Sequence, residues 1–183
     1  MELFLNRIAS PLGEMLLVTD GQGMVHALDF TNHQVRLHRE LRERFSGIEL
    51  REAIETETAK MISGKLDRYF KGDVTALDDI AVAADGSDFQ RQIWEALRKI
   101  PAGETTTYGE LARSLGHTDP RIAKDIGAAI GANPIAVIVP CHRVIGKDGT
   151  LKGYAWGLQR KHRLLIHEKA EVPQRGINAL LSL

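Results

Sequence analysis

One short segment of the sequence gathers residues that can carry out nucleophilic chemistry. Cys141, the only cysteine, is followed by His142 and Arg143 and comes after a run of apolar residues. A thiolate is the nucleophilic form of cysteine, and a neighbouring imidazole or cation favours it. Adjacent side chains of an extended segment point to opposite faces, so Cys141 and His142 meet only if the chain turns or a water bridges them. Glu168 is one of several carboxylates that could orient the imidazole, and the sequence does not choose among them.

A buried strand is expected to lead into this segment. Residues 135–139 are mostly β-branched and apolar on both faces, which is typical of a fully buried strand. Beyond Arg143, glycine-containing turns at 146–149 and 153–157 precede an amphipathic helix predicted over 158–168.

Three further helices are expected before the strand. Capping boxes at 87–90 and 107–110 predict the starts of the first two helices. Asp119 and Pro120 are expected as the N-cap and first-turn proline of the third helix, which runs to about Gly131. The second and third helices, joined by a three- or four-residue turn, form a helix-turn-helix candidate.

The first part of the chain predicts a small α/β unit. Partly alternating apolar runs at 2–8, 14–19 and 24–30 are separated by turn residues, which predicts a three-stranded antiparallel sheet. Two helical stretches follow, marked by Leu37, Leu41 and Phe45 and then by Met61, Leu66, Tyr69 and Phe70.

The expected fold class is therefore α/β (α+β) with two domains. The N-terminal domain, 1–84, combines the three-stranded antiparallel sheet with helices and supports the rest, with a linker at about 77–86. The C-terminal domain, 85–170, is mainly helical and contains the helix-turn-helix candidate, a pattern that also occurs in helical hairpins that bind nothing. Residues 171–183 form a tail without a firm period.

Composition limits the class of protein further. The 183 residues are 43% apolar and 26% charged, as in folded, water-soluble chains. The uncharged stretch 126–140, which Cys141 and His142 extend to 17 residues, is the longest in the chain, whereas a membrane-spanning helix needs about 20. The start of the chain lacks the features of a signal peptide and a single cysteine cannot form an internal disulfide, which predicts a reducing, cytoplasmic location.

Charge is distributed unequally along the chain. Residues 1–84 hold 10 Lys/Arg and 14 Asp/Glu, whereas residues 85–183 hold 14 and 10, so the net charges are −4 and +4. The second half is the better candidate for contact with a polyanion, and an ordinary solvated surface is the alternative interpretation.

A longer motif around the cysteine resembles a known family. Residues 133–146, Asn-Pro-Ile-Ala-Val-Ile-Val-Pro-Cys-His-Arg-Val-Ile-Gly, together with 149–154 and 164–168, closely resemble the O6-alkylguanine-DNA alkyltransferases, also called methylated-DNA-protein-cysteine methyltransferases. The match runs from about Phe89 to Glu168, and the N-terminal strands with the turn 10–13 also resemble that family's first domain. The resemblance implies that the mainly helical C-terminal domain contains a winged helix-turn-helix-like DNA-binding motif. It also implies a direct-reversal DNA repair protein that flips O6-alkylguanine out of duplex DNA.

The resemblance also implies a role for individual residues. Cys141 would attack the alkyl carbon and keep the alkyl group irreversibly, so that each molecule acts once; His142 would take the thiol proton through a water, and Glu168 would hold the imidazole. The implied substrate-binding residues are Tyr108, Ile130, Asn133, Val144, Tyr154, Ala155 and Trp156. The implied DNA-binding residues are Tyr108, Arg121 and Lys124. Trp156 stands where the family usually has glycine, and Lys124 where an arginine normally fills the gap left by the flipped base.

No cofactor and no metal is expected from this resemblance. The implied partner is double-stranded DNA that contains O6-alkylguanine, with O4-alkylthymine as a second candidate lesion, and the protein is expected to act as a monomer without a membrane. His33 and His38 are interpreted as part of a solvated helix face, since no cysteine pair accompanies them.

Two other classes of protein compete with this interpretation. A helix-turn-helix DNA-binding regulator would use Cys141 as a thiol sensor, but it leaves the Pro-Cys-His-Arg motif unexplained. A cysteine hydrolase would use the same Cys-His pair with repeated turnover. A cysteine-dependent phosphatase is disfavoured because its arginine lies several residues after the cysteine, whereas Arg143 is only two away.

Overall fold

The computed structural model describes residues 1–52, 55–83 and 85–171. They divide into two compact units, one formed by Met1–Gly86 and Pro134–Ile138, the other by Ser87–Asn133 and the described residues from Val139 onward. The stretch Pro134–Ile138 thus belongs to the first unit, although the sequence boundaries group it with the C-terminal domain. Nearly all of the expected tail, 171–183, lies outside the described residues.

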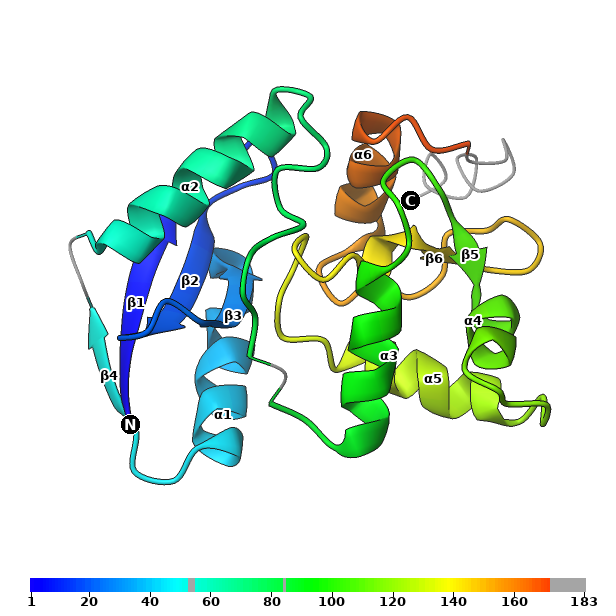
Figure 1. Ribbon diagram of the computed structural model, residues 1–183, viewed down its shortest axis with the longest axis horizontal. Helices are drawn as coiled ribbons and strands as arrows, with labels where there is room; N and C mark the ends of the chain where they lie inside the picture. Colours follow the sequence, from blue (N-terminus) through cyan, green and yellow to red (C-terminus); the bar gives the residue numbers. More distant parts are fainter. Residues whose placement is uncertain (53–54, 84, 172–183) are drawn as a thin grey trace. The chain divides into compact units, whose positions relative to one another are not determined.

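The first unit is built on a four-stranded sheet (Figure 1). Its strands are β1 (Glu2–Ile8), β2 (Met15–Asp20), β3 (Val25–Phe30) and β4 (Glu49–Glu52), in the order β3-β2-β1-β4. The antiparallel pairing of the first three is confirmed. The prediction of only three strands is corrected by β4, which pairs in parallel with β1. This strand, Glu-Leu-Arg-Glu, is short and mostly exposed, so it lacks the apolar alternation that marks the others.

Helices cover both faces of this sheet. Helix α1 (Gln34–Arg44) follows a short 3-10 turn, η1 (Thr31–His33), and contributes to one core cluster formed by Leu3, Leu5, Leu16, Val18, Ala27, Leu37 and Leu41. Helix α2 (Glu57–Phe70) contacts β1 and β2. Its N-cap, Thr56, donates a hydrogen bond to Asn6 Oδ1 at 3.3 Å. Leu5 packs with α1, whereas Asn6 contacts the N-cap of α2. Adjacent residues of a strand point to opposite faces of the sheet, so α1 and α2 lie on opposite faces.

Met61, one of the apolar residues that mark this helical stretch in the sequence, does not lie on the buried face of α2. Met61 is 49% exposed, whereas Ala59, Ile62, Leu66 and Tyr69 are buried. These four residues recur at spacings of three and four, so a residue adjacent to Ile62 is rotated by about 100° away from the core.

The predicted linker packs against the free edge of β3. The backbone amide of Ala83 donates to Val25 O at 2.8 Å, and Val25 N donates to Ala81 O at 3.0 Å. Further along the same strand, Leu28 N donates to Pro134 O and Ala136 N donates to Leu28 O. Two segments far apart in sequence therefore satisfy the backbone groups of an edge strand.

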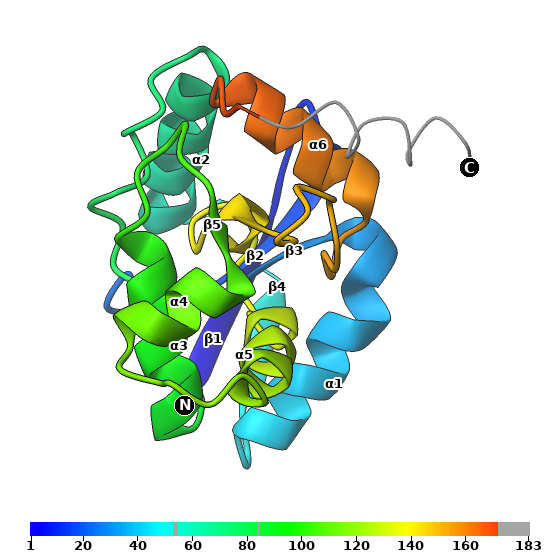
Figure 2. The same cartoon turned by 90° about the vertical axis from the view of Figure 1, so that its right-hand side faces the viewer.

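The second unit is mainly helical, with α3 (Asp88–Arg98), α4 (Tyr108–Ser114), α5 (Ile122–Gly131) and α6 (Leu158–His167). Both predicted capping boxes, at 87–90 and 107–110, are confirmed. The indole Nε1 of Trp94 donates to Ala129 O at 2.9 Å and joins α3 to α5. Helix α5 also packs beside α4, as Figures 1 and 2 show. A short parallel pair, β5 (Thr106–Thr107) and β6 (Val144–Ile145), completes the unit.

The start of α5 differs from the prediction. Arg121, not Asp119, occupies the N-cap position, and the Asp119 carboxylate accepts from the Arg121 backbone amide at 2.9 Å. Bonds from Ile122 N to Asp119 O and from Ala123 N to Pro120 O form a tighter turn ahead of the regular helix. The connection between α4 and α5, Leu115–Arg121, is therefore longer than a three- or four-residue turn.

The predicted strand over 135–139 is also wrong, although all five residues are buried. Only Ile135 makes a bridge, to Leu28. Val137 has a φ of 66°, and Ile138 N donates to Ala136 O at 2.6 Å, so the backbone turns. A 3-10 turn, η2 (Cys141–Arg143), follows. Uniform burial cannot distinguish a strand from another buried conformation, because it carries no periodicity.

Candidate active site

Cys141 begins η2 and is only 2% exposed. The side-chain amide of Asn133 donates from Nδ2 to Cys141 Sγ at 3.3 Å and to Val139 O at 3.0 Å. Asn133 follows the C-cap of α5, so one buried side chain joins the end of this helix to the sulfur. A donor aimed at sulfur stabilises the thiolate form of a cysteine.

His142 and Glu168 form a fully buried pair. His142 Nε2 lies 2.8 Å from Glu168 Oε1, and both side chains are inaccessible to solvent. Burial lowers the pKa of His142, and the positive charges of Arg143 and Lys161 lower it further, while Glu168 opposes the shift. His142 is therefore neutral at neutral pH.

Arg143 holds the same carboxylate from its other side. Arg143 Nε donates to Glu168 Oε2 at 2.9 Å and Nη2 donates to Oε1 at 2.8 Å, while Nη1 donates to Ile100 O at 2.5 Å. Burial alone would raise the pKa of Glu168, but the hydrogen bonds and charges of His142 and Arg143 bring it well below its ordinary range. Arg143 thus pairs with Glu168. On sequence alone, this residue is a candidate cation next to the Cys141 thiol.

These contacts fix the tautomer of His142. An ionised carboxylate only accepts hydrogen bonds, so Nε2 must carry the proton when the imidazole is neutral. Nδ1 then carries a lone pair, and it is buried without a hydrogen-bond partner among the described residues. Since Cys141 and His142 lie in one 3-10 turn, the strand alternation that would keep their side chains apart does not apply. His142 Nδ1 is therefore a basic nitrogen in the same turn as the Cys141 thiol.

Tyr108, at the start of α4, links three parts of the second unit. Its hydroxyl donates to Lys152 O at 3.1 Å. A methyl group placed on Gly127 of α5 would lie 3.8 Å from the Tyr108 ring, and one on Gly153 would lie 3.3 Å from the hydroxyl oxygen. Burial raises the pKa of Tyr108, and the negative charge of a Cys141 thiolate adds to this, so the phenol stays protonated.

Lys161, on α6, is a buried cation in the same region. Its Nζ donates to three backbone carbonyls, Val144 O at 2.5 Å, Lys152 O at 2.8 Å and Gly153 O at 3.4 Å. The ammonium thus joins β6, which follows the cysteine turn, to the loop that accepts from Tyr108.

The aromatic residues after Gly153 form a series of edge-on ring contacts that begins at His142. Tyr154 packs edge-on against His142, with ring centroids 6.5 Å apart, and against Trp156, at 5.2 Å. Trp156 is 1% exposed, and its carbonyl accepts from Arg160 Nη1 at 3.1 Å. Ala155, between the two aromatic residues, is partly exposed, and Ile130 on α5 is buried. The indole is therefore buried, and it packs against the Tyr154 ring.

The two cations expected to contact DNA differ in their surroundings. Arg121 is paired with Asp119, with Nη2 2.7 Å from Oδ2. Lys124, one helical turn later, is exposed, and its side chain makes no hydrogen bond or ion pair in the part of the chain that the structure describes. It also lies three residues before Gly127, which adjoins Tyr108, so Lys124 and the tyrosine contact share one side of α5.

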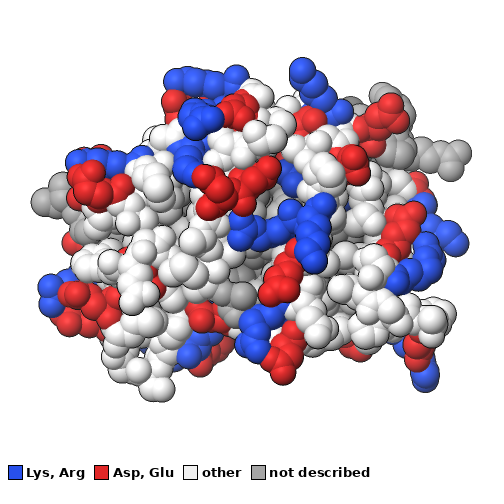
Figure 3. All heavy atoms as spheres, viewed as in Figure 1, with Lys and Arg blue, Asp and Glu red and all other residues white. Residues whose placement is uncertain are grey.

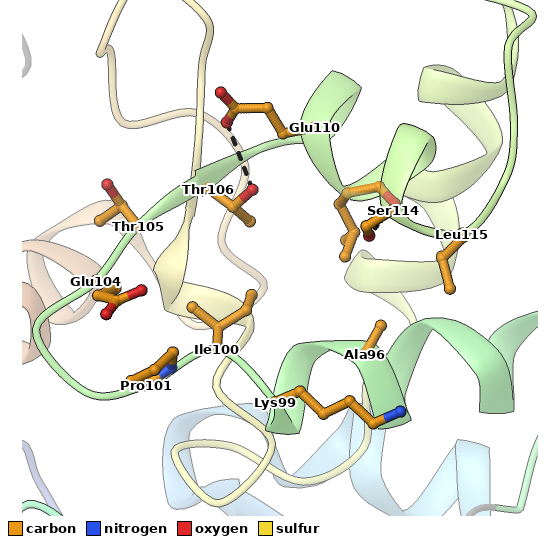
Figure 4. Close-up of a pocket in the computed structure, with 11 residues that line it drawn as sticks. Ala96, Lys99, Ile100, Pro101, Glu104, Thr105, Thr106, Glu110, Ser114 and Leu115 are labelled. Carbon is orange, nitrogen blue, oxygen red and sulfur yellow. Dashed lines mark hydrogen bonds between the residues drawn. The ribbon is translucent and has the colours of Figure 1, made fainter.

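A separate cavity of about 500 Å³ lies between the end of α3 and the start of α4 (Figure 4). Thr106 and Glu110, which are hydrogen-bonded to each other, stand on one side of it and Lys99 on the other. Its lining contains none of the predicted site residues. On the face drawn in Figure 3, acidic and basic side chains are interspersed, so the positive charge of the second half does not form one large patch there.

The fold and the site together define a two-unit α/β protein whose helix-turn-helix unit carries a buried cysteine beside an imidazole–carboxylate pair. Two family models match it: the ribonuclease-like domain of 6-O-methylguanine DNA methyltransferase over residues 4–84, and the DNA-binding domain of the same protein over 88–170. The chain belongs to the 6-O-methylguanine DNA methyltransferase family.

Individual relatives match along nearly the whole chain. The methylated-DNA–protein-cysteine methyltransferase of Salmonella typhimurium is 42% identical over 168 residues, which cover 92% of this chain and 96% of that protein. The protein of the same name from Methanosarcina acetivorans is 40% identical over 156 residues, covering 85% and 92%. The crystal structure of Mycobacterium tuberculosis OGT in complex with DNA has a TM-score of 0.74 and 35% identity, covering 93% of this chain and 96% of that one.

Lys161 is not among the residues predicted for the site. Arg143 is predicted as a cation near the thiol, and it contacts Glu168 instead. A signal for Lys161 was available, because it shares the spacing of Leu164, Leu165 and Glu168 on the buried face of the closing helix. No helix among the described residues is both long and apolar enough to cross a membrane.

Proposed function

We propose that Cys141 is the residue with which this chain removes alkyl groups from O6 of guanine in double-stranded DNA. The chain is a methylated-DNA–protein-cysteine methyltransferase and acts by direct reversal of the damage. One observation supports the assignment of Cys141 as the nucleophile. The Asn133 amide donates to the Cys141 sulfur, and His142, in the same turn, has its imidazole oriented by Glu168. The alkyl group stays on the protein, so each molecule reacts once.

The chemical step is a single displacement at the alkyl carbon. His142 Nδ1 takes the thiol proton through a bridging water, and the thiolate electron pair forms the Sγ–C bond. The C–O6 bond breaks, its electron pair stays on the guanine, and the guanine takes up one proton. The net exchange is therefore one alkyl group for one proton, and the product is a thioether, which water does not hydrolyse.

The damaged guanine must leave the base stack to reach a buried sulfur, which costs a few kcal/mol. We assign its recognition to the Tyr108 hydroxyl, the Val144 carbonyl and the Ala155 amide. Ile130, Tyr154 and Trp156 form or support the walls around it, and Asn133 holds the sulfur. Lys124 fills the gap that the flipped base leaves, and Arg121 contacts the DNA nearby. A thiol that must stay reduced supports a cytoplasmic location with access to DNA.

A stoichiometry experiment tests this function. Duplex DNA with one O6-methylguanine, in tenfold excess over protein, is expected to yield one repaired guanine per protein molecule and then no more. Cys141→Ser should yield none while it binds the same duplex, because the helix-turn-helix is unchanged. Continued turnover would contradict the proposal and favour a hydrolase, and binding without any transfer by the unaltered chain would favour a regulator.

A further inference from the structure

Lys161 is a charged side chain in an environment where ammonium groups are rarely found. It is completely buried on α6, and its hydrogen-bond acceptors are three backbone carbonyls, with no carboxylate among them. Burying an ammonium without a counter-ion is costly, and the cost is reduced only when each N–H group has an acceptor. A leucine at this position of an amphipathic helix would avoid that cost, so the charge calls for another explanation.

The three acceptors connect Lys161 to groups on both sides of the proposed guanine position. Val144 O accepts from the ammonium, and Val144 is the third residue after Cys141. Lys152 O accepts from both Lys161 Nζ and the Tyr108 hydroxyl. Gly153, with a φ of 54°, brings its backbone against the same hydroxyl. One ammonium thus fixes the carbonyl of Val144 and the loop on which Tyr108 rests.

We propose that Lys161 is a positioning residue for guanine recognition: its ammonium holds the Val144 carbonyl and the Lys152–Gly153 loop where Tyr108 and Val144 can bind the flipped base. This inference rests on the proposed function, because it takes those two residues as guanine contacts. Lys161 itself touches neither the base nor the alkyl group. Its loss is expected to impair recognition of guanine while the thiol remains able to react.

A direct electrostatic effect on the thiol is the competing role. A Cys141 thiolate and Lys161 interact favourably, and the Lys161 charge also disfavours protonation of His142. Burial lowers the pKa of Lys161 to about 8, which the thiolate opposes. If the ammonium acted mainly by stabilising the thiolate, its removal would slow every alkylation of Cys141 equally. The two roles therefore differ in how substrates with and without guanine respond.

The experiment compares three methyl donors on the full chain: a duplex with O6-methylguanine, the free base O6-methylguanine, and methyl iodide. Methyl iodide contains no guanine; the thiolate displaces iodide, which leaves with its electron pair. Methylation at Cys141 is quantified by peptide mass spectrometry. In Lys161→Met, both guanine donors should react at least 30-fold more slowly, and methyl iodide within threefold of the original rate. Lys147→Met, which removes an exposed lysine from the nearby turn, should leave all three rates within threefold.

Several outcomes would overturn the proposal. An equal loss with all three donors assigns Lys161 to the thiolate or to general stability, and unchanged rates remove it from the site. Lys161→Gln, whose amide keeps two N–H donors, covers the case in which the methionine variant does not fold, and it should show the same selective loss to a smaller degree. If the unaltered chain fails to methylate itself from the duplex, the proposed function fails; a reactive unaltered chain with an unselective Lys161 variant rejects only this inference.

A double-mutant cycle sharpens the assignment. Tyr108→Phe removes the hydroxyl that shares Lys152 O with the ammonium. If Lys161 acts by placing Tyr108, the tyrosine substitution should slow duplex repair much less in the Lys161→Met background than in the original chain. Fully additive losses would show that the two residues act independently and would overturn the positioning role.

Discussion

Two histidines of the chain are buried against carboxylates, one in each unit, and they differ in their second ring nitrogen. In the first unit, His26 Nδ1 lies 2.8 Å from Asp85 Oδ2 and Nε2 lies 3.1 Å from Asp20 Oδ2. In the second unit, His142 Nε2 contacts Glu168, but Nδ1 has no partner among the described residues. Burial beside a carboxylate is thus common to both residues, and only one of them retains a free nitrogen.

This difference gives the two histidines different roles: His26 is a clamp that holds parts of the first unit together, and His142 can act as a base. His26 has a carboxylate oxygen at each of its ring nitrogens, so this ring joins β2, β3 and residue 85 and presents no nitrogen without a partner. His142 has one nitrogen fixed by Glu168, and Arg143 holds that carboxylate in turn. The fixed side orients the ring and the other side can accept a proton, which is the arrangement that general-base catalysis requires.

The largest expected effect is the loss of the base. His142→Asn should slow methyl transfer from an O6-methylguanine duplex by about 10²- to 10⁴-fold, the usual contribution of a general base. His26→Asn, the matched control, should leave the rate within threefold and lower the free energy of unfolding by about 1–3 kcal/mol, because it removes a buried side chain that contacts Asp20 and Asp85. Single-turnover kinetics and urea unfolding give the two quantities. Equal rate losses in both variants would remove the distinction between clamp and base.

The next effect concerns the cation that fixes Glu168. Arg143→Met removes both bonds from the guanidinium to Glu168 and leaves the buried carboxylate beside a neutral His142. Breaking a buried pair in this way costs about 3–5 kcal/mol, so urea unfolding should show a loss of this size. Arg91→Met, which removes an exposed arginine that pairs with Asp88, should change the unfolding free energy by less than about 1 kcal/mol. A small loss for Arg143→Met would mean that Glu168 does not depend on the arginine.

The pH dependence of stability tests whether His142 is buried in its neutral form. Burial holds the folded-state pKa of His142 below 6.5, so the unfolded chain binds a proton more readily below that pH. This group's contribution is complete above about pH 6.5 and is lost as the pH falls, by about 1.4 kcal/mol per unit until the folded-state pKa is reached. His142→Asn should flatten the curve between pH 7 and pH 5 relative to that of the original chain. Parallel curves for the original chain and His142→Asn would contradict a buried neutral imidazole.

The smallest effect extends the comparison to two cations at the start of α5. Arg121 is held by Asp119, whereas the Lys124 side chain is exposed and makes no hydrogen bond or ion pair among the described residues. Lys124→Ala should slow duplex repair about fivefold, equivalent to about 1 kcal/mol or one modest hydrogen bond, and leave the reaction with free O6-methylguanine unchanged. Lys124→Arg should speed the duplex reaction, since a planar guanidinium offers more donors to an unpaired base. If Arg121→Ala is the damaging change and Lys124→Ala is silent, the assignment is wrong by one helical turn.

Local signals in the sequence predicted much of the fold. Capping boxes and alternation identify α3, α4 and the first three strands, because these features act over a few residues. Strand β4 escaped prediction since three of its four residues are charged and exposed, so it shows no apolar alternation. The turn at Val137 escaped because buried residues of any conformation can be apolar.

The candidate site was predictable only as a set of residue types. Cys141, His142 and Glu168 could be named from a resemblance, but the sequence could not say that Arg143 holds the carboxylate, because that depends on a fold that brings residues 143 and 168 together. The role of Lys161 was hidden for a different reason. Its partners are backbone carbonyls, which every residue possesses, so no residue type at positions 144, 152 or 153 marks the interaction.

The most direct test of the central claim is to locate the transferred methyl group. The chain is incubated with a duplex whose O6-methylguanine carries a deuterated methyl, and the intact mass and the digested peptides are then measured. The account predicts one labelled methyl per molecule, placed on Cys141 as S-methylcysteine, with no further gain when more duplex is added. A label on any other residue, more than one label per molecule, or release of the label into solution would contradict it.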